Sequence, residues 1–228
     1  MSARRDPRGL TMPPGRRIPR PSPPRVTRPA PPSEEGPVPD VAKSGGELAA
    51  LAAEIRGCRE CGRDGSSCAF GSGYPRAPLM LIKERPGPED LRTETAWADE
   101  APSIARALDR LKVPFSWTYG TTVVRRGDQP ATDDQLKSCA AHLLVEIEAV
   151  EPVVVVAFGP RVLQALTYLD GRCGLSVGEV EQGRPQRVRD DLLLLVTEPV
   201  PEGVTIPDSK RRLWRDLQEL PALLGLTS

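Results

Sequence analysis

The chain has 228 residues, of which 39% are hydrophobic and 27% charged, and its formal net charge is zero. These proportions suit one α/β domain with a tail. The chain lacks a run of the roughly 18 apolar residues that a membrane span needs, and its N-terminus lacks the apolar core of a signal peptide. We therefore expect a cytoplasmic monomer that makes no membrane contacts.

The charge is unevenly distributed along the chain. Residues 1–32 carry eight Arg and one Asp, a net charge of +7, whereas the remainder carries 23 basic and 30 acidic residues, or about −7. Residues 1–40 also hold 12 of the 26 prolines and almost no large apolar side chains, which predicts a disordered arm ahead of a folded domain over residues 41–228. The arm could hold DNA phosphates in a salt-dependent way. The alternative is a solvated tail without a partner.

The apolar run at residues 79–82 has the character of a buried parallel strand. Pro86 and Gly87 then force a tight loop at its carboxyl end, where open α/β sheets bind ligands. Charged side chains gather at this expected pocket floor, namely Lys83, Glu84, Arg85, Glu89 and Asp90. The alternative is a solvated charged loop.

Strand and helix patterns alternate through the rest of the chain. Further strands are predicted over residues 119–124, 152–157 and 192–196, and helices over residues 44–56, 102–111, 133–150 and 161–169, the third opened by a capping box at Thr132. This alternation predicts a three-layer α/β/α sandwich with a short, mainly parallel, four-stranded sheet.

The segment from Phe70 to Asp90, FGSGYPRAPLMLIKERPGPED, resembles family 4 uracil-DNA glycosylases, which have approximately FGxGxPxAxLMxIGEAPGxxED here. Lys83 and Arg85 stand where the family has a Gly and an Ala, so two large cations enter a loop that the family keeps small. The resemblance extends over about residues 45–224. It implies the same sandwich fold, DNA as partner, and a role in base-excision repair.

Cys58 and Cys61 form a C-x-x-C pair, which in a cytosolic chain suggests metal, cluster or redox chemistry. In the family this pair begins a four-cysteine set that holds a [4Fe–4S] cluster. The resemblance places Cys139 at the fourth ligand position but Arg126 at the third, and Cys68 is a candidate replacement. A retained cluster, a bound zinc ion and a site without metal all remain open.

The resemblance also implies the residues of the base-binding site. It assigns catalytic positions to Glu84, Asp90 and Glu198, and substrate-binding positions to Gly71, Trp97, Thr122 and Pro199. Trp97 occupies the position of the aromatic residue that stacks on the extruded base. Thr122 replaces an Asn that reads uracil, and Glu198 replaces a His directly before Pro199.

These replacements weaken the case for uracil chemistry. The single hydroxyl of Thr122 cannot reproduce a two-point amide contact. An ionised Glu198, together with the carboxylates between Glu84 and Asp90, would make the pocket unusually negative and oppose an anionic leaving base, unless burial keeps Glu198 protonated. We expect weak or altered base excision, favouring cationic alkylated bases. The alternative is an inactive protein that binds DNA, a lesion or another partner.

Overall fold

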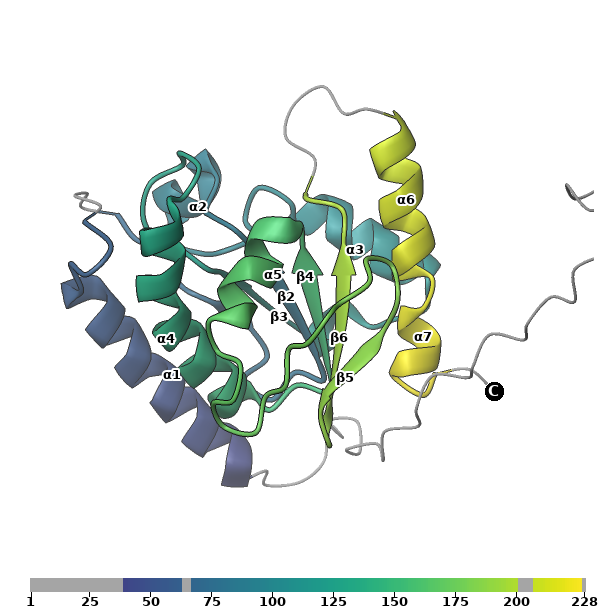
Figure 1. Ribbon diagram of the computed structural model, residues 1–228, viewed down its shortest axis with the longest axis horizontal. Coiled ribbons are helices and arrows are strands. Elements are labelled where there is room, and N and C mark those ends of the chain that lie inside the picture. Colours follow the sequence, from purple (N-terminus) through teal and green to yellow (C-terminus); the bar gives the residue numbers. More distant parts are fainter. Residues whose placement is uncertain (1–38, 63–66, 201–206, 227–228) are drawn as a thin grey trace, which may run out of the picture.

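The computed structural model describes residues 39–62, 67–200 and 207–226 (Figure 1). Nearly all of the arm predicted for residues 1–40 lies outside these ranges. Helix α1 spans Pro39–Gly57, so the predicted boundary between residues 40 and 41 falls inside a helix. Within the described ranges, no helix is long and apolar enough to cross a bilayer.

In the described part of the chain, the sheet has six strands in the order β1-β3-β2-β4-β6-β5. Its four central strands are parallel and confirm the predicted sheet: β3 (Thr118–Thr122), β2 (Leu79–Lys83), β4 (Val154–Phe158) and β6 (Leu192–Thr197). The edges carry two further antiparallel strands, β1 (Ser72–Gly73) and β5 (Gln186–Arg189). Sequence patterns missed these edge strands because both are short and neither contains an apolar run.

Seven further helical segments follow α1 among the described residues. They are α2 (Pro88–Thr93), α3 (Ala101–Arg110), the 3-10 turn η1 (Phe115–Trp117), α4 (Asp133–Val150), α5 (Pro160–Thr167), α6 (Pro207–Leu217) and α7 (Leu220–Leu223). The predicted capping box at Thr132 is confirmed, because its hydroxyl accepts the Gln135 N–H at 3.3 Å and the Gln135 side chain returns to the Thr132 amide.

Helices cover both faces of the sheet, with α1, α4 and α5 on one side and α3, α6 and α7 on the other (Figure 1). Alternate side chains of each central strand enter the two separate cores. Met80 and Ile82 pack toward α4 and α5, whereas Leu79 and Leu81 pack toward α3 and α6. This arrangement confirms the three-layer α/β/α sandwich and explains why the central strands are apolar throughout.

Two local predictions need correction. The charged segment after the Pro-Gly turn is helix α2 rather than a loop, with Asp90 buried inside it. Strand β3 ends at Thr122, two residues before the predicted end. The next two amides, of Val123 and Val124, donate to the carbonyls of Lys83 and Glu84 at 2.9 and 3.0 Å, which fixes the backbone where β2 ends.

Candidate functional site

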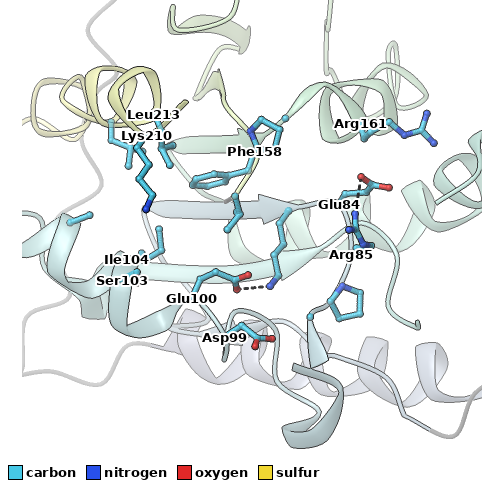
Figure 2. A pocket seen from close by; sticks show the side chains of 18 of the residues that line it. Glu84, Arg85, Asp99, Glu100, Ser103, Ile104, Phe158, Arg161, Lys210 and Leu213 are labelled. Atoms are coloured by element: carbon cyan, nitrogen blue, oxygen red, sulfur yellow. Dashed lines mark hydrogen bonds and ion pairs between the residues drawn. The ribbon is translucent and has the colours of Figure 1, made fainter. Parts of the chain in front are cut away.

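A pocket of about 760 Å³ opens at the carboxyl ends of β2 and β4, between α3 and α6. Its apolar lining comes mainly from Ile104, Phe158, Leu213, Trp214 and Leu217. Figure 2 shows Lys210 and Leu213 of α6 on one side of the pocket and Ser103 and Ile104 of α3 on the other. The pocket therefore lies where the sequence predicted a ligand site.

Lys83, the last residue of β2, is the central charged group of this pocket. Lys83 is only 5% exposed, and its ammonium nitrogen lies 2.7 Å from Asp90 Oδ2 and 2.5 Å from Glu100 Oε2. The same nitrogen lies 5.5 Å from the centroid of the Trp97 ring. Two carboxylates and an aromatic face thus compensate the cost of burying this cation.

Asp90 lies beneath the pocket, because α2 carries it into the interior with no exposed surface. Besides Lys83, its carboxylate accepts the N–H groups of Gly87 and Asp99, each at 3.2 Å. Asp90 therefore holds Lys83 and the two loops beside it. Its carboxylate does not reach the pocket surface, so Asp90 does not lie where a catalytic carboxylate was predicted. Its complete burial also excludes the alternative of a solvated charged loop at this residue.

Trp97 is packed into the core rather than presented to the pocket. It is 5% exposed, its Nε1–H donates to the Thr121 carbonyl at 2.9 Å, and its ring meets Phe158 edge-on at 4.9 Å. A Cβ added to Gly120 would lie 2.6 Å from Trp97 Cδ1, so glycine is needed for the ring to fit against β3. Trp97 borders a second, apolar cavity of about 500 Å³ instead.

Thr122 and Gly71 also have structural partners away from the main pocket. The buried Thr122 hydroxyl donates to the Val124 carbonyl at 2.7 Å. A Cβ on Gly71 would collide with Tyr119 and Glu146, whose side chains form a hydrogen bond of 3.1 Å. Neither residue contributes to the lining of the main pocket.

Glu84 is the one predicted catalytic carboxylate that lines the pocket. It follows β2 directly, accepts the Ala131 N–H at 2.8 Å, and lies 3.6 Å from Arg85 Nη1. Its side chain is 16% exposed and faces Arg85 at the pocket wall (Figure 2).

Glu198 follows β6 and forms an ion pair beside the pocket. It accepts hydrogen bonds from Arg212 Nε at 2.5 Å and Gln182 Nε2 at 3.0 Å. The Arg212 hydrogen bond holds the pKa of Glu198 below its ordinary value, so the carboxylate is ionised and its charge is paired. The adjacent Pro199 does line the pocket, where it packs against Gly159.

The described residues do not make the pocket unusually negative, contrary to the expectation from the sequence. Among them, the lining holds four cations, Lys83, Arg85, Arg161 and Lys210, and four carboxylates, Glu84, Asp99, Glu100 and Asp128. Lys83, the last residue of β2, and Arg85, two residues later, supply two of these cations, and the charge of Glu198 beside the pocket is paired with Arg212. The described lining therefore carries no net negative charge that would favour a cationic base, and a preference for alkylated bases stays a prediction.

The model of the uracil DNA glycosylase superfamily matches residues 70–218, which is more than half of the chain. The chain belongs to the uracil-DNA glycosylase superfamily. The matched range contains the pocket and all four central strands, which agrees with the architecture above. It begins after Cys58, Cys61 and Cys68, so the closer resemblance to family 4 and its cluster stays a prediction.

Arg126 takes a structural role in this superfamily member at the predicted third ligand position. Its guanidinium donates to the carbonyls of Arg56 at 2.6 Å and Ile55 at 3.4 Å, at the carboxyl end of α1. These carbonyls belong to the last turn of the helix, where a cation is favourable, and the Ile55 carbonyl also accepts the Cys58 N–H at 3.2 Å. Arg126 thus ties α1 to the domain by hydrogen bonds.

The described structure does not gather the four candidate cysteines into one group of ligands. Cys61 lies beside Cys139, and burial raises the pKa of the Cys139 thiol to about 12. Cys68 packs in a separate apolar cluster with Leu51 and Ile55. Among the described residues no group of three or more His, Cys, Asp or Glu side chains is placed to hold a metal ion. Cys58, Cys61, Cys68 and Cys139 as ligands of a cluster or of zinc therefore stay a prediction.

Sequence patterns missed Glu100, Lys210 and Trp214 as pocket residues. Glu100 stands one residue before α3 and reaches Lys83 only through the fold. The basic run at residues 210–212 was a visible signal for a cationic wall, but periodicity alone does not tell which side of α6 faces the pocket.

Proposed function

We propose that this protein binds DNA in base-excision repair and excises uracil weakly or not at all. The observation that carries the proposal is the position of Lys83, whose ammonium lies over the Trp97 ring and is held by Asp90 and Glu100. In the family that the sequence resembles, this position is glycine and the aromatic ring stacks on the extruded base. A base that stacked on Trp97 would have to displace a buried, doubly paired cation.

The groups that would support departure of uracil are also absent from their expected positions. Removing one donor to a developing oxyanion typically slows an enzyme by about 10²–10³-fold. Here Glu198, where the family has a His donor, is ionised and can only accept hydrogen bonds. The Thr122 hydroxyl is already used by the Val124 carbonyl. Glu84 alone remains to orient a water molecule, which is consistent with weak residual excision.

The pocket rim supports DNA binding independently of base excision. Helix α6 contributes the exposed Lys210 to the pocket wall, and it exposes three further basic side chains, Arg211, Arg212 and Arg215, outside the pocket lining. Arg85 and Arg161 line the pocket on its other walls. Contacts from such cations to phosphates position a protein on DNA without reading its bases.

The test uses labelled single- and double-stranded oligonucleotides that are undamaged, contain uracil, or contain a tetrahydrofuran analogue of an abasic site. We expect salt-sensitive retention of DNA, with preference for the analogue, and little or no uracil release. A Lys210→Glu variant should bind all three DNAs more weakly, whereas Lys137→Glu on α4 serves as the matched charge control. Rapid uracil release by the wild-type protein, or failure to retain any of these DNAs, would refute the proposal.

A further inference from the structure

We infer that Lys83 captures the aldehyde of a base-free deoxyribose as a covalent iminium ion. This inference rests on the proposed DNA-binding function and names the lesion that the same pocket takes. The acceptor is the open-chain form of an abasic nucleotide, in which C1′ of the sugar is an aldehyde carbon. Lysine amines form Schiff bases with carbonyl carbons of this kind.

The position of the ammonium group selects this substrate. Lys83 lines the pocket and its Nζ lies 5.5 Å from the centroid of the Trp97 ring, which is itself packed in the core, so a base that entered to stack on this ring would have to take the place of Lys83. A normal nucleotide therefore carries a base that competes with Lys83 for the same space. A base-free nucleotide has no such group, and the atom that carried its base, C1′, is the part of the sugar that would face the nitrogen. The cation that opposes base excision is thus placed to meet the product of base excision.

The two carboxylates around Lys83 provide the proton transfers that imine formation needs. Glu100 Oε2 lies 2.5 Å from the ammonium nitrogen and can accept its proton, which frees the lone pair. Burial raises the pKa of Glu100, so this side chain can hold a proton more readily than an exposed glutamate. Because Glu100 retains 18% exposure, the proton acceptor also borders the pocket from which the sugar would arrive.

The step balances in atoms and charge. The freed amine attacks C1′, a C–N bond forms as the C=O π bond breaks, and the oxygen takes up the proton from Glu100. A second proton from the same nitrogen leaves with this oxygen as water, and the C=N bond forms. One ammonium ion and one aldehyde have become one iminium ion and one water molecule. Because the positive charge is conserved, Asp90 and Glu100 pair with the product as they pair with Lys83.

Lys210 provides a matched comparison within the same pocket. The chain contains five lysines, and two of them, Lys83 and Lys210, line this pocket. Lys210 is exposed on α6 and reaches toward the pocket from the opposite side to Glu100 (Figure 2). It therefore reports whether any pocket lysine would react, or only the one held between the carboxylates.

The experiment incubates the full-length protein with oligonucleotides carrying either an aldehydic abasic site or its tetrahydrofuran analogue, which has no aldehyde. Sodium cyanoborohydride reduces an iminium ion to a stable amine, which appears as a shifted band on a denaturing gel and is located by peptide mass mapping. We expect an adduct at Lys83 with the aldehydic DNA only. Lys83→Arg, which keeps the positive charge, should lose the adduct, while Lys137→Arg on α4 should keep it, and peptide mapping of the wild-type protein should find no adduct at Lys210. Thermal melting of both variants confirms that they are folded.

The outcomes separate the two proposals. Retention of the tetrahydrofuran DNA without an adduct on the aldehydic DNA overturns the iminium inference and leaves the DNA-binding function standing. An adduct at another lysine or at the N-terminal amine, or one that persists in folded Lys83→Arg, also overturns it. Failure to retain either DNA, with no adduct, overturns both.

Discussion

Replacing Lys83 with methionine tests the energetic basis of the pocket, because methionine keeps the apolar stem and removes the charge. Asp90, which has no exposed surface, would lose the ammonium group that pairs with its carboxylate. Removing one member of a buried ion pair typically costs about 3–5 kcal/mol. Since Glu100 is 18% exposed and can turn toward solvent, we expect the lower end, about 3 kcal/mol in the free energy of unfolding. For a domain of this size that lowers the Tm by about 6–12 °C.

Urea denaturation of four proteins measures this interaction: wild type, Lys83→Met, Asp90→Asn and the double variant. The double variant should recover part of the loss, giving a coupling energy of about 1–3 kcal/mol between the two positions. Lys210→Met is the control for removing a lysine from the same pocket, and should stay within about 0.5 kcal/mol of wild type because its side chain is exposed. A Lys83→Met protein as stable as wild type, or a coupling energy of zero, would refute the assigned role of the ion pair.

Three further predictions concern groups outside the pocket. Burial lowers the pKa of His142 below its ordinary value of 6.5, so on acidification the unfolded chain takes up this proton at a higher pH than the folded protein does. The free energy of unfolding should therefore fall as the pH drops from 6.5 toward the lower pKa of the folded protein. In urea titrations, His142→Gln should reduce this dependence on pH. Because it is the only histidine, its ring protons report that pKa directly by NMR. Iodoacetamide at pH 8 should modify exposed Cys173 and spare Cys139, whose thiol has a pKa of about 12; rapid labelling of Cys139 in folded protein would contradict this. Deleting residues 1–32, which carry +7, should flatten the salt dependence of DNA binding; an unchanged slope would show that the arm contributes no phosphate contacts.

Local patterns were sufficient to predict the sandwich. Runs such as Val154–Phe158 are apolar at every position, which requires cover on both faces and hence helices on both sides. The Thr132 capping box was likewise visible, because all of its partners lie within four residues. The two edge strands were not, since β1 contains only Ser72 and Gly73 and its pairing with β3 depends on chain far away in sequence.

For the candidate site, the sequence by itself determined which residues are present and which family positions they occupy: Lys83 for a glycine, Glu198 for a histidine and Arg126 for a cysteine. It also placed Glu84 at the end of a central strand, which the structure puts on the pocket wall.

Only the tertiary structure decided what these charges do. Lys83 and Glu100 are 17 residues apart, and Glu198 and Arg212 are 14 apart, so their pairing depends on how α3 and α6 pack beside the sheet. The charged residues in the sequence suggested a negative pocket, because a sequence does not show which carboxylates are paired with cations. In the folded protein these carboxylates pair with cations, because burying an unpaired charge costs far more free energy than burying a paired one. The described pocket lining is therefore balanced in charge, with Lys83 at its centre.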